Sequence, residues 1–275
     1  MVTNVDQYAV LGNPIAHSKS PIIHTAFANQ FKHTKTPQNI TYESKLAPIN
    51  AFAVTVRDLF NQGYKGLNVT VPFKFEAYQL CDSLSARAKN SGSGAVNTLI
   101  NMNGEIHGDN TDGVGLLSDI EKNLGFSIAN KHILILGAGG AADGVLNSLL
   151  SASSITIANR THKKALALAM GIKDCDASAI IFEALEKPYD LIINATSAGL
   201  TDSVLPIPDV IFSQDTLAYD MMYGRETSFM AQARNAGATV ADGLGMLVEQ
   251  AAEAFYLWRN VRPDTQSVIH MLRAQ

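Results

Sequence analysis

Residues 132–161 read HILILGAGGAADGVLNSLLSASSITIANRT, and this stretch decides the class of fold. It begins with a short apolar run at Ile133–Leu136, passes through a glycine-rich turn and continues into a helical pattern over Ala141–Leu150. A second apolar run follows and ends in polar residues. The order strand, glycine turn, helix and strand predicts a β-α-β unit of the kind that binds dinucleotides.

The turn has the composition that an approaching pyrophosphate requires. Gly137 permits a tight turn, Gly139 lets the backbone come close to phosphate, and Ala142 is small enough for the helix to pack on the strand. An ordinary strand-to-helix turn is the alternative, because a glycine pattern alone is weakly specific. With strands on both sides we expect the whole turn to bind the cofactor: Gly137, Ala138, Gly139, Gly140, Ala141 and Ala142.

The end of the second apolar run indicates which dinucleotide is bound. NAD-binding units place an acidic residue about 20 positions after the glycines, where it accepts hydrogen bonds from the ribose. Here Asn159, Arg160 and Thr161 occupy that place, Lys164 follows, and the next acidic residue is Asp174. A guanidinium suits a phosphate group, so these four residues predict NADP(H) as the cofactor. The alternative is a solvated basic helix start.

Length and composition place the chain among globular proteins. Its 275 residues are enough for two ordinary domains, with 47% hydrophobic and 17% charged residues. A formal net charge of −4 leaves no broad basic surface, so we expect no nucleic-acid partner. Because no stretch approaches the ~20 apolar residues of a membrane helix, and Cys81 and Cys175 are isolated, we expect a cytoplasmic protein without a membrane partner.

The patterns outside residues 132–161 predict further α/β structure. Ser20 and Pro21 suggest an N-cap and first residue of a helix, and Asn103 with Gly104 suggests a hairpin turn. The expected strands are Tyr8–Leu11, Ile40–Lys45, Gly66–Thr70, Val96–Asn101, Glu105–Gly108, Leu191–Asn194, Leu217–Asp220 and Thr239–Ala241. The expected helices are Pro21–Phe31, Ile49–Gln62, Asp112–Leu124, Gly243–Asn260 and Thr265–Arg273.

Polar motifs stand at the expected strand ends, where parallel α/β sheets place ligands. They are His17-Ser18-Lys19-Ser20-Pro21, Asn68-Val69-Thr70-Val71-Pro72-Phe73-Lys74, Ala95-Val96-Asn97-Thr98, Gly108-Asp109-Asn110-Thr111-Asp112-Gly113, Asp220-Met221-Met222-Tyr223 and Asp242-Gly243-Leu244-Gly245-Met246-Leu247-Val248-Glu249-Gln250. In order and spacing, from about Tyr8 to Gln250, the chain resembles the shikimate dehydrogenase family. One local departure is Gly224-Arg225, where the family commonly has Asn-Pro.

The resemblance implies an NADP-dependent, reversible interconversion of 3-dehydroshikimate and shikimate. It also implies an N-terminal α/β substrate domain with a mostly parallel sheet, formed by residues 1–111 and 243–275. A Rossmann-type NADP-binding domain would comprise residues 112–242, with a cleft between the two domains. The expected protein is a monomer or homodimer that acts in chorismate and aromatic amino-acid biosynthesis.

Two residues are expected to carry the proton transfer. Reduction of a ketone by hydride leaves an alkoxide that must gain a proton, so an acid is needed beside the carbonyl group. By resemblance, Lys74 is this group and Asp112 is its partner. A free lysine has a pKa of about 10.4 and the carboxylate would raise it further, so burial would have to lower the pKa of Lys74. A plain structural salt bridge is the alternative.

The resemblance assigns the remaining site residues. Shikimate carries a carboxylate and hydroxyls, which hydroxyl and amide groups recognise well. The expected substrate-binding residues are Ser18, Ser20, Thr70, Lys74, Asn97, Asp112, Tyr223 and Gln250. Further cofactor contacts are expected from Thr196, Ser197, Met221 and Gly243. We expect no metal, because no His, Cys or Asp cluster has the spacing of a metal site.

Two other functions are considered. Quinate/shikimate dehydrogenases share the substrate motifs, but they often bind NAD through an acidic residue after the second strand of the β-α-β unit. In this chain no Asp or Glu follows that strand before Asp174. A non-catalytic sensor of shikimate or NADP would have no need for the Lys74 and Asp112 pair. Both are less consistent with the residues than the NADP-dependent enzyme.

Overall fold

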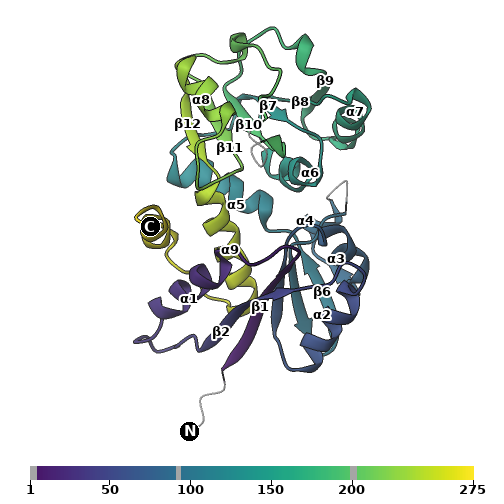
Figure 1. The fold of residues 1–275 in the computed structure, drawn as a ribbon, viewed down its shortest axis with the longest axis vertical. Coiled ribbons are helices and arrows are strands. Elements are labelled where there is room, and N and C mark those ends of the chain that lie inside the picture. Colours follow the sequence, from purple (N-terminus) through teal and green to yellow (C-terminus); the bar gives the residue numbers. More distant parts are fainter. Residues whose placement is uncertain (1–4, 91–93, 199–202) are drawn as a thin grey trace. The chain divides into compact units, whose positions relative to one another are not determined.

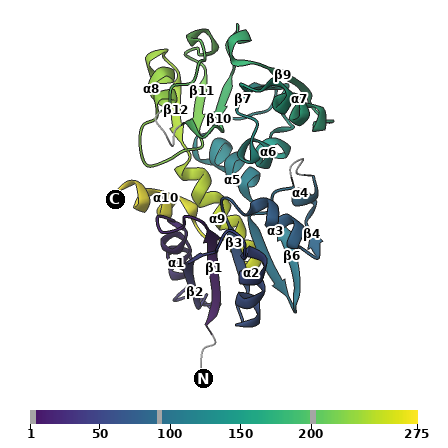
Figure 2. The same cartoon turned by 45° about the vertical axis from the view of Figure 1, so that its right-hand side comes forward.

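The structure is a computed structural model that describes residues 5–90, 94–198 and 203–275. The chain forms two compact units, one of Met1–Gly115 with Val248–Gln275 and the other of Leu116–Leu247. Each unit is built on a six-stranded sheet with helices packed against it (Figures 1 and 2). No helix in the described part of the chain has both the length and the apolar composition needed to cross a membrane.

The sheet of the first unit has the order β2-β1-β3-β5-β6-β4. Its strands are β1 (Asp6–Gly12), β2 (Ile40–Leu46), β3 (Gly66–Val69), β4 (Ser83–Leu84), β5 (Thr98–Met102) and β6 (Glu105–Asp109). Pairing is parallel except for β5, which is antiparallel to β3 and β6. The start of β5 therefore lies at the same edge of the sheet as the ends of β3 and β6.

Helices pack against this sheet (Figures 1 and 2). They are α1 (Ser20–Gln30), α2 (Phe52–Asn61), α3 (Lys74–Leu80), α4 (Ala86–Lys89), α10 (Thr265–Arg273) and the later part of α9 (Leu244–Arg259). Helices α2 and α3 lie side by side in both views, and α1 packs on β2 and α10 (Figures 1 and 2). Phe52 of α2 stacks on Phe73, which directly precedes α3, so the beginning of α3 is anchored in the core.

The second unit has an entirely parallel sheet with the order β12-β11-β10-β7-β8-β9. The strands are β7 (His132–Leu136), β8 (Ser154–Ala158), β9 (Asp176–Ile180), β10 (Leu191–Asn194), β11 (Leu217–Asp220) and β12 (Thr239–Asp242). The chain proceeds from β7 outward to β9, and β10 then restarts on the other side of β7. This reversal creates the switch point at which doubly wound sheets bind dinucleotides.

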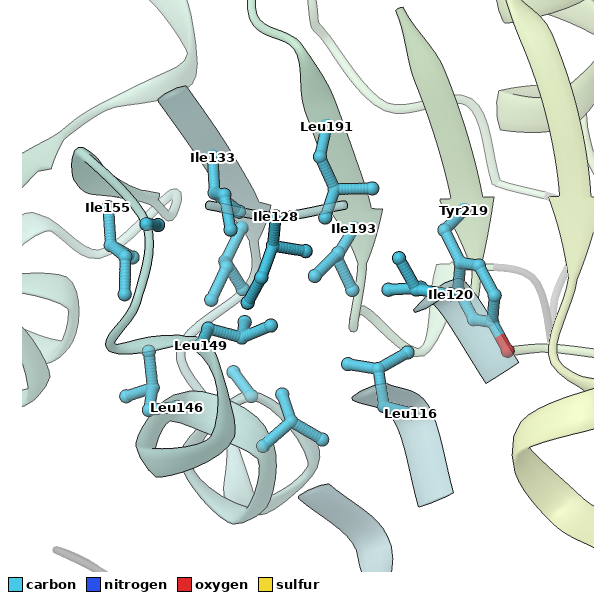
Figure 3. Close-up of a cluster of buried hydrophobic side chains, with 14 of the residues drawn as sticks. Leu116, Ile120, Ile128, Ile133, Leu146, Leu149, Ile155, Leu191, Ile193 and Tyr219 are labelled. Carbon is cyan, nitrogen blue, oxygen red and sulfur yellow. The ribbon is translucent and has the colours of Figure 1, made fainter. Parts of the chain in front are cut away.

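Apolar side chains alternate between the two faces of this sheet, as the pleat requires. In Figure 3, Ile133, Ile155 and Ile193 point to one face, toward Leu116 of α5 (Asp112–Ser118) and Leu146 of α6 (Gly140–Leu146). The intervening residues of the strands face a second cluster that includes α8 (Ser228–Asn235), while α7 (His162–Gly171) packs on β8 and β9. Helices on both faces explain the continuous apolar runs of the strands.

The predicted fold class is confirmed, with two α/β units and parallel-rich sheets. The predicted N-cap is wrong by one residue: Lys19 occupies the N-cap position and Ser20 is the first helical residue, with no side-chain cap. The helix expected over Asp112–Leu124 changes after Ser118 into a π-helix, Asp119–Asn123. The helix expected over Ala141–Leu150 ends earlier, in a 3₁₀ turn at Asn147–Leu149.

Candidate active site

One edge of the first sheet gathers several of the predicted site residues. Lys74 begins α3, after the turn that follows β3, and Asp112 begins α5, after β6. Asn97 directly precedes β5, which runs in the opposite direction. The antiparallel strand therefore brings Asn97 to the edge where β3 and β6 end, between the segments that carry Lys74 and Asp112.

Lys74 and Asp112 form an ion pair at this edge. The Nζ atom of Lys74 donates a hydrogen bond of 2.5 Å to Oδ2 of Asp112. Their side chains are 27% and 12% exposed, respectively. The lysine amine is therefore held by a largely buried carboxylate, and the lysine side chain remains partly exposed.

The second oxygen of Asp112 is held by Asn97. The Nδ2 atom of Asn97 donates to Oδ1 of Asp112 at 2.7 Å, and the backbone N–H of Asp112 donates to Oδ1 of Asn110 at 3.0 Å. Asn97 and Asn110 are both buried. Both carboxylate oxygens thus have defined donors, which fixes the orientation of Asp112.

Gln250 reaches the same cluster from α9. Its Oε1 atom accepts long hydrogen bonds from Nδ2 of Asn97 at 3.4 Å and from Oγ1 of Thr111 at 3.5 Å. The backbones approach closely here, because a Cβ atom on Gly115 would lie 2.7 Å from the backbone nitrogen of Gln250. A glycine one turn after Asp112 is therefore needed for α9 to bring Gln250 beside the pair.

The other predicted substrate-binding residues of this unit lie on separate segments. Thr70 is half-buried in the turn after β3, where its carbonyl oxygen accepts from the backbone N–H of Phe73 at 3.1 Å. Ser18 and Ser20 stand at the start of α1, and the backbone N–H of Ser20 donates to Oγ of Ser18 at 3.3 Å. Ser20 is buried and Ser18 half-buried, so the two hydroxyl groups differ in access.

Tyr223, Met221 and Gly243 belong to the second unit. Tyr223 is half-buried after β11, and burial raises the pKa of its phenol. A Cβ atom on Gly243 would lie 2.3 Å from the carbonyl oxygen of Met221. Gly243 is thus required by close packing against the Met221 backbone. The nearby Gly224 has a positive φ of 84°, which a glycine adopts without strain.

The second unit contains a pocket of about 570 Å³ at the switch point between β7 and β10. Gly137 follows β7 with a positive φ of 105°, whereas Cβ atoms on Gly139 and Gly140 would meet nothing within 4 Å. The predicted cofactor residues that line it are Gly137, Ala138, Gly139, Gly140, Ala141, Asn159, Arg160, Thr161, Lys164, Thr196 and Ser197. Ala142 is buried behind it in the core, and Met221 and Gly243 are not among the lining residues.

Charge and shape of this pocket fit a phosphorylated dinucleotide. Arg160 and Lys164 are exposed at its rim, and within the described residues neither forms an ion pair with a carboxylate. Oγ1 of Thr196 donates to Oδ1 of Asn194 at 2.7 Å, which fixes the loop after β10. Backbone without side chains on one wall and cations on another suit a pyrophosphate and a further phosphate group.

Some residues at these sites were not assigned a role from the sequence. Thr98 and Thr111 belong to motifs named above, but only the tertiary structure shows that both form hydrogen bonds with Asn97. Phe182 and the segment 203–206 line the pocket in the second unit, and nothing in their local sequence predicts this. In the described part of the chain, no group of three or more His, Cys, Asp or Glu side chains could hold a metal ion.

These features together define a class of protein. A doubly wound sheet with an open glycine turn and a cationic rim is typical of a dinucleotide-dependent oxidoreductase. The first sheet adds an amine–carboxylate pair of the chemical kind that can exchange protons.

Comparison with known proteins identifies the family within this class. Residues 10–99 match the model of the shikimate dehydrogenase substrate-binding domain, residues 119–202 that of shikimate/quinate 5-dehydrogenase, and residues 243–272 that of the shikimate 5′-dehydrogenase C-terminal domain. A shikimate dehydrogenase (NADP(+)) from Methylobacillus flagellatus is 56% identical over 98% of this chain and 100% of that protein. The chain belongs to the shikimate dehydrogenase family.

Solved structures agree in fold. The crystal structure of an Ael1 enzyme from Pseudomonas putida has a TM-score of 0.91 and 44% identity, and the match covers 97% of this chain and 98% of that one. Shikimate 5-dehydrogenase from Thermus thermophilus, in complex with NADP(H) and shikimate, has a TM-score of 0.86 and 33% identity over 98% of this chain and 99% of that one.

Proposed function

We propose that this protein catalyses the reversible NADP-dependent reduction of 3-dehydroshikimate to shikimate, with Lys74 as the proton-transfer group and Asp112 as its partner. The observation that carries the proposal is the 2.5 Å contact between Lys74 Nζ and Asp112 Oδ2, in a chain of this family. The relative that is 56% identical is named for NADP(+). This cofactor fits Arg160 and Lys164, which are exposed at the pocket and form no ion pair with a carboxylate among the described residues.

The roles of the residues follow from their chemistry. When bound, NADP(H) supplies or accepts the hydride. In the direction of reduction, the Lys74 ammonium donates a proton to the oxygen of the ketone, and in oxidation the amine takes a proton from the hydroxyl group. Asp112 orients the amine of Lys74 and accepts a hydrogen bond from a hydroxyl group of the substrate. Asn97 and Gln250 also bind hydroxyl groups of the substrate ring. Ser18, Ser20, Thr70 and Tyr223 supply hydroxyl donors for the remaining polar groups of the substrate.

The domain roles form part of the same proposal. Residues 1–111 and 243–275 form the substrate domain, and residues 112–242 form the NADP-binding domain. The glycine turn, Asn159, Arg160, Thr161, Lys164, Thr196, Ser197, Met221 and Gly243 hold the cofactor. We expect a cytoplasmic enzyme of aromatic amino-acid biosynthesis that is a monomer or homodimer.

Initial rates of cofactor reduction, with shikimate or quinate and with NADP⁺ or NAD⁺, test the substrate and cofactor. We expect a strong preference for shikimate with NADP⁺. Comparable rates with quinate or NAD⁺ would instead place the enzyme with the quinate/shikimate dehydrogenases. Binding of shikimate without turnover of either substrate would favour the sensor.

The Lys74→Met substitution tests the proton transfer. It removes the amine and keeps much of the stem, so turnover should fall by ~10²–10⁴-fold with little change in affinity for NADP⁺. Lys65→Met, at an exposed lysine of the same unit, is the matched control and should leave turnover unchanged. Normal turnover of Lys74→Met would remove Lys74 from the mechanism.

A further inference from the structure

We propose that Thr98 is a positioning residue, whose hydroxyl group holds the Asn97 amide in place and strengthens the hydrogen bond that Asn97 donates to Asp112. The inference rests on the proposed function, because it assigns Thr98 a part in holding the pair of Asp112 and Lys74. Thr98 is fully buried at the start of β5 and cannot itself reach a ligand.

The direction of the Asn97 amide follows from its neighbours. The backbone N–H of Thr111, which can only donate, lies 2.9 Å from Oδ1 of Asn97, and Nδ2 lies 2.7 Å from a carboxylate oxygen of Asp112. A flipped amide would set two donors against each other at Thr111 and two acceptors against each other at Asp112. Only one orientation is therefore compatible with the site.

Thr98 adds a further donor to the same oxygen, which the hydroxyl group of Thr111 also approaches at 3.2 Å. Its Oγ1 atom donates to Oδ1 of Asn97 at 2.9 Å. The hydroxyl group has this direction because Asn68 already donates to it, with Nδ2 of Asn68 3.2 Å from Oγ1 of Thr98. Donors on Oδ1 polarise the amide, so the hydrogen bond that Nδ2 donates to Asp112 becomes stronger.

The orientation of Asn68 is fixed in the same way. Its Nδ2 atom also donates to the backbone carbonyl of Asn97 at 3.2 Å, and a carbonyl can only accept. Oδ1 of Asn68 therefore faces Tyr42, whose hydroxyl group donates to it at 2.7 Å. Burial raises the pKa of Tyr42 well above its ordinary value, although a hydrogen bond from Ser20 opposes this, so Tyr42 remains a donor.

The sheet explains why these residues meet. In the register of β3, β5 and β6, Asn68 lies opposite Thr98, and Thr98 lies opposite Asp109. The hydrogen bonds run in one direction, from Tyr42 through Asn68, Thr98 and Asn97 to Asp112. Asn68, Thr98 and Asn97 are at most 6% exposed, so water does not offer competing partners.

Thr98→Val and Thr98→Ser separate the hydroxyl group from the packing of the side chain. Valine keeps the shape and loses the donor, whereas serine keeps the donor and loses a methyl group. With saturating NADP⁺, we expect Thr98→Val to lower kcat/KM for shikimate by about threefold to tenfold, the value of one hydrogen bond, without changing KM for NADP⁺. Thr98→Ser should stay within about twofold of the unsubstituted enzyme.

Thr156→Val is the matched control, because Thr156 is a buried strand threonine of the second unit whose hydroxyl group contacts Ser178 at 3.2 Å. It should not alter kcat/KM for shikimate. Melting temperatures of all three variants report loss of folded protein separately from loss of activity. Normal kinetics of Thr98→Val, or a larger loss in Thr98→Ser than in Thr98→Val, would overturn the inference.

Lys74→Met, measured alongside, distinguishes this inference from the function on which it rests. If Lys74→Met loses turnover while Thr98→Val is unaffected, only the role of Thr98 is wrong. If Lys74→Met retains full turnover, the proposed roles of Lys74 and Asp112 fail, and the role of Thr98 fails with them.

Discussion

At the scale of single residues, Arg160 is the side chain that we propose distinguishes NADP from NAD. Arg160 is exposed and, with Lys164, lines the pocket at the switch point of the second unit. The preceding residue, Asn159, donates a hydrogen bond of 3.0 Å to the carbonyl oxygen of Thr161. A planar guanidinium can bind a phosphate group through two hydrogen bonds at once. Its contribution should therefore depend on the phosphate that only NADP carries.

Arg160→Ala should raise KM for NADP⁺ by about tenfold to a hundredfold, and change KM for NAD⁺ by less than about threefold, because hydrogen bonds to charged groups are the stronger ones. Initial rates with the two cofactors at saturating shikimate measure this. Lys163→Ala is the control, since Lys163 is exposed but does not line the pocket. An equal effect of Arg160→Ala on both cofactors would contradict the role of Arg160.

At the scale of secondary-structure elements, Arg87 connects three segments of the first unit. From α4 it donates to both carboxylate oxygens of Asp109 at the end of β6, at 3.1 Å and 2.7 Å, and to Glu253 of α9 at 2.8 Å. Burial acts to raise the pKa of Asp109, but the hydrogen bonds of Arg87 and Ser85 hold it below its ordinary value. This cluster ties the strand before Asp112 to the helix that carries Gln250.

Arg87→Met would leave the carboxylates of Asp109 and Glu253, which are 4% and 6% exposed, without their shared partner. Breaking a buried pair costs about 3–5 kcal/mol, but one third of Arg87 is solvent-exposed, so screening should reduce the loss in free energy of unfolding to about 2–3 kcal/mol. Denaturant titration measures it. Arg262 is exposed and pairs with Glu253 but not with Asp109. Arg262→Met should therefore lower the free energy of unfolding by less than about 1 kcal/mol. If Arg87→Met lowered the free energy of unfolding no more than Arg262→Met, the ion-pair cluster would not stabilise the first unit.

At the scale of the whole molecule, we expect the buried His24 to make stability depend on pH. It is stacked on Tyr42 at 4.1 Å between ring centroids, lies 5.5 Å from Trp258, and among the described residues neither ring nitrogen has a hydrogen-bond partner. Burial lowers its pKa to about 3, and the nearby Asn68 opposes this only in part. In an unfolded chain the pKa of a histidine is about 6.5.

The sign of the effect follows from these two values. Above about pH 6.5 the side chain is neutral in both states and costs nothing. As the pH falls toward the folded value of about 3, the unfolded state takes up a proton that the folded state cannot, so stability decreases. The first unit should therefore lose about 2 kcal/mol between roughly pH 7 and pH 5 through His24 alone.

His24→Phe should abolish this part of the acid sensitivity, because phenylalanine fits an aromatic cluster and does not titrate. The fluorescence of Trp258, the single tryptophan, reports denaturant unfolding of the first unit at each pH. His33→Phe, at an exposed histidine, should retain the pH dependence of the unsubstituted protein. Parallel stability curves for His24→Phe and the unsubstituted protein would disprove the role of His24.

Local patterns in the sequence were sufficient for much of the fold. The apolar run at Ile133–Leu136 and the glycines after it predicted a strand and its turn, and the structure has β7 over His132–Leu136 and a positive φ at Gly137. Helix α10 over Thr265–Arg273 also agrees with the prediction. These features depend on neighbours within a few residues, so a single sequence carries the information.

Other elements escaped prediction because their stability comes from distant contacts. The short helix α3 has little periodicity of its own and is anchored by the stacking of Phe73 on Phe52. Gly66 reads as an ordinary strand residue, but a Cβ atom there would lie 2.2 Å from Nε1 of Trp258, far along the chain. The π-helix after Ser118 contains Asp119, which accepts from Tyr219 of β11 at 2.7 Å.

By itself, the sequence determined the α/β class, the glycine turn, the cationic residues beside it and the motifs that resemble the family, because each is a local pattern of side-chain size, charge or periodicity. Only the tertiary structure decided that β5 runs antiparallel to its neighbours, that Asn97 thereby lies beside Asp112, and that the Thr98 hydroxyl donates to its amide. These contacts join residues from different strands, and their geometry is set by sheet register and buried hydrogen bonding, which no local pattern encodes.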